Sequence, residues 1–443
     1  MKLLYLTRNL LALALLFSAV TSKAFENKTI TKKDSSSTVK TDSSGSRKVD
    51  VATNTKAAEA DTAWKPVRRL WGLSFGDFYY AAHSSTTTQG AETNYYGVPT
   101  GRNAFQFRRL YLGYDYDINR KFSVELLLSS EPVASNAVSG TTTITNGDNL
   151  ADNKMAFFIK LANLKVKNIW NGTDFVIGDQ VTPLTGLIGD QIWGYRSIER
   201  TVADFHRSNT YDVGAALRGV FDPATQNFGY NIMIGNNTQS AILSAANPNT
   251  GFYKIFYGEV YAKFLDKRLI FDVYADYAKT APATAALGAQ DHSILKGLAA
   301  YTTPAFTFGI EAYTQQIVNG VTNVTAGKVG QNATVEAISF YTRGAIYNDK
   351  LGFFARYDSY NPDNNFNGAD VYTANTNFTA YSPFTKEHFI TAGLDFSPAK
   401  NVHFMPNIWF LQFEDLRDPT TTGYLPDNHI LVYRLTFLFQ FGK

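Results

Sequence analysis

Residues 429–441 read HILVYRLTFLFQF, and this stretch decides the fold. Bulky apolar side chains occupy every second position from Leu431 to Phe441, and the positions between them include Arg434 and Gln440. A period of two predicts a β-strand whose two faces meet different surroundings. An aromatic-rich strand of this kind at the C-terminus of an exported chain is typical of an outer-membrane β-barrel, with lipid outside and a lumen within.

The N-terminus has the features of an export signal. Lys2 and Arg8 lie close to an apolar core over 10–19, and small residues at 22–24 provide a cleavage site. The apolar core is too short to span a bilayer comfortably. We therefore predict a signal peptide at residues 1–24, with an uncleaved anchor helix as the alternative.

The composition of the chain excludes several classes of protein and of binding site. The chain has 443 residues, a net charge of +3 and no cysteine, which excludes disulfides, thiolate metal sites and a lipid anchor on cysteine. The small net charge gives no argument for nucleic acid. No later run of about 18 apolar residues predicts a transmembrane helix. The aromatic content of 14% fits the interfacial belts of a barrel.

The rest of the chain divides into two regions that differ from each other in composition. Residues 25–62 are rich in Ser, Thr, Lys and Asp and are almost free of aromatics. Such a segment buries too little apolar surface to offset its chain entropy, so we predict disorder in the periplasm, as a solvated leader, a tether or a cell-wall contact. Residues 63–443 form the predicted outer-membrane barrel.

The barrel prediction is all-β, with about sixteen antiparallel strands of roughly nine or more residues, the length that a tilted strand needs to cross a bilayer. The predicted strands are 70–82, 104–117, 121–129, 154–166, 173–180, 211–220, 227–236, 253–265, 267–279, 293–303, 305–315, 333–347, 350–360, 387–397, 401–413 and 429–441.

The connections between these strands alternate between tight and long. Tight connections are predicted at 118–120, 168–172, 221–226, 266, 304, 348–349 and 397–400. Long connections lie between them, among them 83–103, 130–153, 181–210 and 361–386. A barrel with both termini in the periplasm requires this alternation, whereas a soluble β-sandwich has no reason to sort its loops by end.

Alternation within the strands also assigns charged side chains to the lumen, because a charge at the lipid midplane costs about 2–4 kcal/mol. The predicted pore-lining residues are Arg109, Glu125, Lys160, Arg218, Glu259, Lys263, Asp272, Asp276, Glu311, Arg343, Arg356, Asp358, Asp395 and Arg434.

The pair Arg108-Arg109 needs a choice, because neighbouring residues on a strand point to opposite faces. The apolar face that includes Leu110 and Leu112 sends Arg109 inward. Arg108 then lies outside near the lipid headgroups, or on a bulge. Arg109 either attracts anions as a pore-wall cation or pairs with a lumenal carboxylate such as Glu125.

Four stretches, in order along the chain, resemble the phosphate-selective porin O and P family. They are 107–114 with the following 122–125, then 177–183, 197–200 and 212–219. The resemblance implies a trimeric sixteen-stranded porin whose third outer loop, here 181–210, folds into the lumen and narrows it. It also implies phosphate selectivity through an arginine ladder and lysine-rich positions.

The third loop carries the predicted constriction residues Arg196, Arg200 and Arg207. One interpretation makes them an anion filter. The other makes them a latch that pins the loop to the wall through acids such as Glu199 and Asp204. The two interpretations are compatible with each other.

Other chemistry has little support in the sequence. The histidines lack metal-ligand spacing, no nucleophile motif accompanies them, and no glycine-rich phosphate loop leads from a strand into a helix. We therefore predict no catalytic residue, no metal and no cofactor.

The predicted function is passive diffusion of small hydrophilic solutes or anions through a porin, a homotrimer in the lipid of the outer membrane of a Gram-negative bacterium. The alternative is a non-conducting barrel that serves as an adhesin or a binding scaffold. Its lumen would be filled by the inward aromatic side chains Tyr257, Tyr261, Tyr341, Trp409 and Phe413.

Overall fold

A computed structural model gives the arrangement of most of the chain. It describes residues 64–85, 95, 98–131, 157–184, 188–206, 210–237, 253–280, 287–375, 383–426 and 428–442. The predicted signal peptide at 1–24 and the predicted disordered segment at 25–62 lie outside the described residues. Among the residues that are described, no helix has the length and apolarity needed to cross a membrane.

Within the described residues, seventeen strands form one antiparallel sheet. They are β1 (Arg68–His83), β2 (Asn103–Asp117), β3 (Phe122–Ser130), β4 (Phe158–Trp170), β5 (Thr173–Val181), β6 (Tyr211–Val220), β7 (Phe228–Gly235), β8 (Ile255–Phe264), β9 (Leu269–Ala278), β10 (His292–Thr302), β11 (Phe306–Asn323), β12 (Lys328–Tyr347), β13 (Leu351–Asn361), β14 (Tyr372–Ala374), β15 (Thr385–Ala399), β16 (Val402–Asp415) and β17 (Asn428–Phe441).

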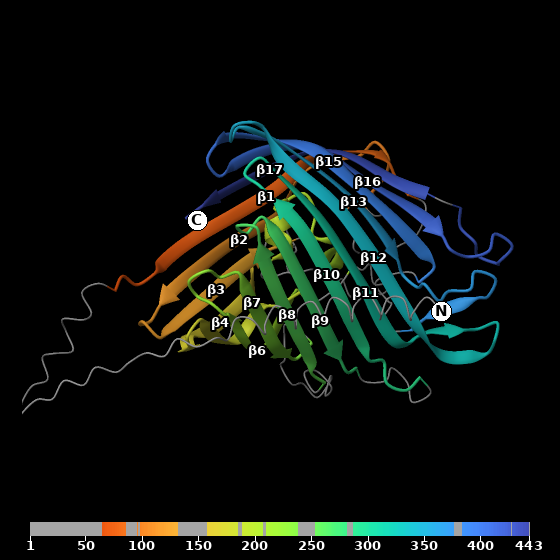
Figure 1. Cartoon of the computed structure of the whole chain (residues 1–443). Helices are drawn as coiled ribbons and strands as arrows, with labels where there is room; N and C mark the ends of the chain where they lie inside the picture. Colours follow the sequence, from red (N-terminus) through yellow and green to blue (C-terminus); the bar gives the residue numbers. More distant parts are fainter. Residues whose placement is uncertain are drawn as a thin grey trace, which may run out of the picture. The chain divides into compact units, whose positions relative to one another are not determined.

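The sheet closes on itself as a barrel (Figure 1). β1 pairs with β2 on one side and with β17 on the other, in a register that sets Gly72 opposite Phe441. The short β14 pairs with β11, and β13 pairs directly with β15, so sixteen of the described strands form the ring. Among the described residues, each of the sixteen ring strands is thus paired on both sides, which is the condition for a sheet to cross a bilayer. The predicted fold class is confirmed.

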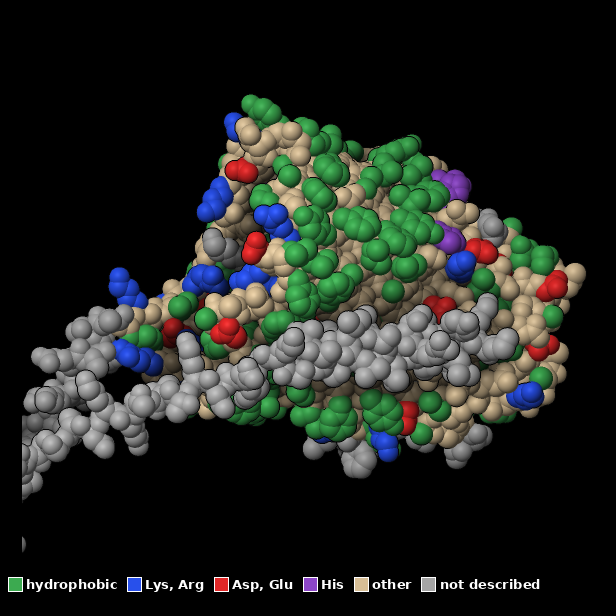
Figure 2. All heavy atoms as spheres, in the orientation of Figure 1, with side chains coloured by type: hydrophobic (Ala, Val, Ile, Leu, Met, Phe, Trp, Pro, Cys, Tyr) green, Lys and Arg blue, Asp and Glu red, His purple; other side chains and the backbone are tan. Residues whose placement is uncertain are grey.

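The two faces of the barrel differ as the alternation predicts. On β9, Phe271 is 39% exposed whereas the next residue, Asp272, is completely buried. On β17, Tyr433 is half exposed and Arg434 is buried. Figure 2 shows apolar side chains spread over the outer surface of the barrel. Charged residues therefore gather on the inner face.

The seven tight connections overlap the predicted positions, although β4 and β15 extend three residues into the predicted connections at 168–172 and 397–400, and antiparallel pairing places all seven at one end of the barrel. Asn168, Asn348 and Asn401 lie in or next to these connections with φ angles of 47°, 46° and 67°. Asparagine tolerates this left-handed conformation better than most residues do. The residue types at these turns thus fit the turn positions that the strand pairing requires.

One predicted long connection is wrong. The sequence predicts strands at 305–315 and 333–347 with a long connection between them, but β11 and β12 continue toward each other and leave only residues 324–327 as a turn. Gly327 takes a φ of 63° in this turn, a conformation that glycine adopts without strain. β14 pairs with the extended part of β11 and supports the long hairpin there.

We expect that Ile232→Arg lowers the free energy of unfolding in phospholipid vesicles by about 2–4 kcal/mol. Ile232 lies in the middle of β7 with 56% of its surface exposed on the apolar outer face, where a charge would meet hydrocarbon. Denaturant titration of the vesicle-inserted protein measures the change.

The matched control is Ala224→Arg, which places the same side chain on an exposed tight connection and should change the free energy by less than about 0.5 kcal/mol. Equal effects of the two substitutions would contradict a lipid-facing outer surface.

Candidate functional site

We call residues 182–210, between β5 and β6, the internal loop; its described residues, 182–184, 188–206 and 210, lie inside the barrel. The amide of Thr182 donates to the carbonyl of Thr210 at 2.8 Å, which closes the base of the loop. The loop contains two short helices, α2 (Gly189–Trp193) and α3 (Val202–Phe205). Its residues contact strands around much of the ring, from β10 to β17 and on to β2. Only a segment inside a closed ring can do this.

Cations of the wall hold the internal loop by its backbone carbonyl groups. Nζ of Lys296 on β10 donates to the carbonyl of Leu184 at 2.7 Å, and Nε of Arg343 on β12 donates to the carbonyl of Ile192 at 2.9 Å. Arg356 on β13 donates to the carbonyl of Arg200 and forms an ion pair with Asp358. A charged donor makes a hydrogen bond worth about 1.5–3 kcal/mol, roughly twice that of a neutral one.

Two further arginines bind the loop from the opposite part of the ring. Arg108 on β2 donates to the carbonyl groups of Ser197 and Ile198, and Nη2 of Arg434 on β17 also donates to the Ile198 carbonyl, at 3.2 Å. Nε of Arg108 lies 2.5 Å from the carboxylate of Asp77, which is buried. The loop is thus attached to β12 and β13 on one side of the ring and to β17 and β2, the two neighbours of β1, on the other.

Acidic residues of the wall and loop add specific contacts. Oε1 of Glu311 accepts from the amide of Ala203 in the first turn of α3, at 3.4 Å. The hydroxyl of Tyr195 donates to Asp395 at 3.1 Å, and Nε1 of Trp409 donates to Glu199 at 3.2 Å. These contacts fix the direction of individual loop side chains within the lumen.

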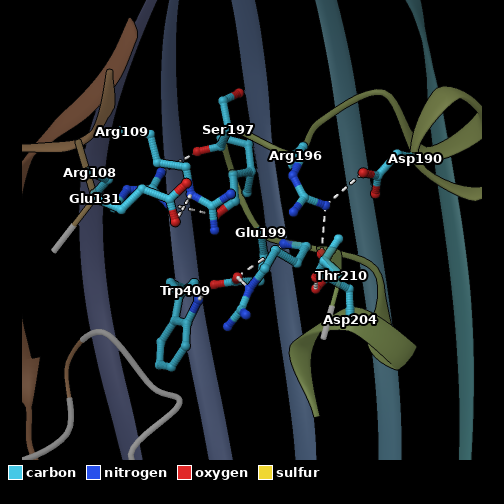
Figure 3. A network of polar contacts seen from close by, with 12 residues as sticks. Arg108, Arg109, Glu131, Asp190, Arg196, Ser197, Glu199, Asp204, Thr210 and Trp409 are labelled. Carbon is cyan, nitrogen blue, oxygen red and sulfur yellow. Dashed lines mark hydrogen bonds and ion pairs between the residues drawn. The ribbon is translucent and has the colours of Figure 1, made fainter. Parts of the chain in front are cut away.

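The loop also contains an ion-pair clasp of its own, drawn in Figure 3. Nη1 of Arg196 lies 2.6 Å from both Asp190 and Asp204, and the hydroxyl of Thr210 donates to Asp204 at 2.6 Å. Burial disfavours the charged form of Asp204, but Arg196 and then Arg200 outweigh it and hold the pKa of Asp204 below its usual value. Burial raises the pKa of Asp190, which Arg196 only partly offsets.

For Arg108 the sequence leaves two alternatives, a position outside near the lipid headgroups or a position on a bulge. The outside position is wrong, and the bulge is confirmed. The β1–β2 register shifts between Phe75 and Gly76, which leaves Arg108 as the extra residue between Phe107 and Arg109. A bulge of this kind turns two successive side chains toward the same face. Arg108 and Arg109 therefore both face the lumen.

A second bulge has the same effect on β4. The β3–β4 register shifts between Leu127 and Leu128, which makes Lys160 the extra residue and turns both Lys160 and Leu161 inward. Glu131, which follows β3, forms an ion pair with Lys160 and lies 4.0 Å from Nε of Arg109. The carboxylate partner of Arg109 is thus Glu131 and not Glu125.

Many of the predicted pore-lining residues hold the loop or one another. Those that bind the internal loop or a residue that binds it are Asp272, Glu311, Arg343, Arg356, Asp358, Asp395 and Arg434. Asp276 accepts from the amide of Ile294 on the neighbouring strand, at 3.1 Å. Their role in lining a water path stays a prediction.

The other predicted wall residues lie elsewhere on the inner face. Within the described residues, Glu125, Arg218, Glu259 and Lys263 form no hydrogen bond or ion pair with the internal loop. Nζ of Lys263 lies 4.8 Å from the centre of the Tyr261 ring. In the loop itself, Arg200 lies 3.7 Å from Glu199, and the predicted Arg207 lies outside the described residues.

Sequence reasoning missed several residues that build this site, above all Asp77, Glu131 and Lys296. Asp77 is two residues from the inward-facing Phe75 and two from Tyr79, so alternation along β1 could have predicted that Asp77 faces the lumen. Lys296 could have been found in the same way on β10, since Leu295 is exposed beside it. No pattern in the sequence marks the two bulges.

Solved structures with a similar fold are outer-membrane porins and channels. An anion-selective porin from Comamonas acidovorans is 13% identical, with a TM-score of 0.52 over 85% of this chain and 100% of that chain. The outer membrane channel DcaP of Acinetobacter baumannii is 10% identical, with a TM-score of 0.53 over 85% and 97%. Outer-membrane OmpT of Vibrio cholerae is 11% identical, with a TM-score of 0.50 over 86% and 99%.

At these identities the similarity shows a shared fold. No protein-family model and no curated protein sequence matches the chain. The barrel with sixteen ring strands therefore has the architecture of outer-membrane porins, and its function must be argued from its own lumen.

We expect that Arg356→Gln loosens the internal loop, because the carbonyl of Arg200 then loses its charged donor. A loss of about 1.5–3 kcal/mol corresponds to a rise of roughly 10- to 150-fold in amide exchange rates over 188–206. Hydrogen–deuterium exchange with mass spectrometry measures this change in the folded protein.

Lys263→Gln is the control, because it removes an inward-facing cation that does not bind the loop. Unchanged exchange over 188–206 in Arg356→Gln would show that the wall arginine does not hold the loop.

Proposed function

We propose that this protein is a porin of the outer membrane, through which small hydrophilic solutes diffuse passively, and that the internal loop is its constriction. The observation that carries the proposal is a loop tied across the lumen of a closed barrel by buried wall cations. Sixteen ring strands enclose a lumen wide enough for solutes. A fixed loop inside such a lumen sets a size limit for what passes.

Open space beside the loop supports this proposal. A cavity of about 430 Å³ lies between the loop and a part of the wall that includes β1 to β3 and β15 to β17, and another of about 270 Å³ lies near the tight connections of β10 to β13. Tyr195, Asp395 and His403 line both cavities. Solutes that pass the loop would therefore move along these side chains.

The cellular setting belongs to the same proposal. Export by the signal peptide at 1–24 would bring the barrel to the outer membrane of a Gram-negative bacterium, with residues 25–62 in the periplasm. The exposed apolar outer face supports contact with lipid (Figure 2). The resemblance to the phosphate-selective O and P family leads us to propose a homotrimer.

An anion or phosphate preference is the finer part of the proposal. Arg218 on β6 supports it, because this inward-facing side chain is partly exposed and forms no ion pair within 4.0 Å in the described part of the chain. Most other lumenal cations are paired with acids or bound to loop carbonyls. The charges of Glu125, Glu259 and Asp174 act on Arg218 only from a distance, so its guanidinium would be available to attract anions in the lumen.

A non-conducting binding barrel is the second candidate, and one observation favours it. Tyr257, Tyr341, Trp409 and Phe413 face inward and are buried, and Trp409 packs against Tyr95 with ring centres 5.3 Å apart. These rings fill part of the lumen that a wide pore would keep wet. In this alternative the outer loops would bind a partner.

Ion conductance of the purified full-length protein in a planar bilayer separates the two candidates. A porin gives stepwise conductance in KCl, and block by added phosphate would support the phosphate preference. Conductance without phosphate block would support a general porin. Folded protein that gives no conductance would contradict the porin proposal and favour the binding barrel.

We expect that Arg218→Glu lowers the anion-to-cation permeability ratio by at least twofold, because it reverses the charge of an unpaired lumenal group. The reversal potential under a KCl gradient gives this ratio.

Arg218→Lys keeps the charge and should leave the ratio near its original value. A reversal potential that is the same in Arg218→Glu and in the unsubstituted protein would exclude Arg218 as a selectivity residue.

A further inference from the structure

Part of the inner wall is apolar where a water-filled lumen calls for polar groups. Trp71, Tyr111, Leu127 and Leu161 form one buried cluster on β1 to β4, and Leu73 packs against it. The outer face of the same strands is apolar as well, since Leu70 and Leu126 are exposed there. Lipid contact accounts for the outer apolar side chains and leaves the inner ones unexplained.

All of these inward apolar side chains except Leu161 line the cavity of about 430 Å³ beside the internal loop. Trp71, Leu73, Phe75 and Leu438 contribute to its apolar side. The loop contributes polar groups, among them Arg196. The volume lies within the range of about 300–1,000 Å³ that is usual for small-molecule sites, and an apolar wall with a few polar groups is their usual composition.

The aromatic side of the cavity is preformed. An added Cβ on Gly113 would lie 2.1 Å from the Trp71 ring, so the glycine allows the indole to lie flat against β2. Nε1 of Trp71 donates to Asp115 at 3.4 Å, which orients the ring further. A flat indole held in place offers an apolar surface to a planar ligand without loss of side-chain freedom.

The polar side offers a guanidinium with spare donors. Nη1 of Arg196 donates to both Asp190 and Asp204, whereas its Nε and Nη2 form no hydrogen bond within the described residues. The Arg196 side chain is 22% exposed and lines the cavity. Figure 3 shows it between the two acids, in the middle of the loop. A planar guanidinium suits a carboxylate, which accepts two parallel hydrogen bonds.

We propose that this cavity binds small aromatic carboxylates, with the ring against Trp71 and Leu73 and the carboxylate on Arg196. The proposal rests on the proposed porin function, because the solute would reach the cavity through the lumen. It adds a solute class to that function: aromatic acids would be retained on their way past the loop, whereas small ions would pass without binding.

Direct binding to the full-length protein in detergent tests the proposal, with benzoate as the probe and calorimetry or ligand-observed NMR as the measurement. Acetate has the same charge without the ring, and benzylammonium has the ring with the opposite charge. We expect benzoate to bind at least tenfold more tightly than either. Equal affinity for benzoate and acetate, or for benzoate and benzylammonium, would overturn the proposal.

A matched pair of variants localises the binding. Leu73→Gln places a polar side chain in the cavity and should weaken benzoate binding at least fivefold, whereas Leu70→Gln alters the outer face of the same strand and should have no effect. Leu438→Gln replaces Leu73→Gln if that variant does not fold. Equal benzoate affinity in the cavity variant and in Leu70→Gln would overturn the assignment to this cavity.

KCl conductance of the same preparations separates the two proposals. Conducting protein that does not bind benzoate overturns the inference and leaves the porin function intact. Benzoate binding that depends on Leu73 in protein that does not conduct would contradict the porin function and the route through the lumen, but would confirm the cavity as a site.

Discussion

Hydrogen bonds from wall cations to carbonyl groups of the internal loop are the interaction on which the lumen depends. The described part of the loop has two short helices and little other regular structure, so many of its backbone carbonyls need partners from outside the loop, and burying such groups unpaired is costly. Lys296, Arg343 and Arg434 supply donors on long side chains that reach inward from different parts of the ring. The barrel thereby determines the position of a segment that has little regular structure.

The same cations illustrate why a charge in a barrel lumen is not by itself a selectivity element. Arg356 is buried, bound to Asp358 and to a loop carbonyl, and therefore unavailable to a passing ion. Arg218 is partly exposed and forms no ion pair in the described part of the chain. Both are inward-facing arginines in the sequence pattern. Their contacts in three dimensions, rather than their parity, distinguish the arginine that holds the loop from the one that does not.

Strand number, tight connections and facing were predictable because each follows from local chemistry. The alternation in 429–441 depends on the residues of one strand, and each asparagine at a tight turn depends on the conformation of that turn alone. The bulges at Arg108 and Lys160 were not predictable, because a bulge depends on the pairing of two strands. The long β11–β12 hairpin and the partners of Arg109 depend on contacts between distant segments in the same way.

Excision of the internal loop tests the account most directly. The hydrogen bond between Thr182 and Thr210 brings the ends of the loop together, so a short Gly-Ser linker can replace residues 185–206 while the sixteen ring strands stay in place. Liposome swelling with sugars of graded size then measures the size limit. The account predicts that the unaltered protein admits only small sugars and that the excised variant also admits larger ones. The same size limit in both proteins would contradict it.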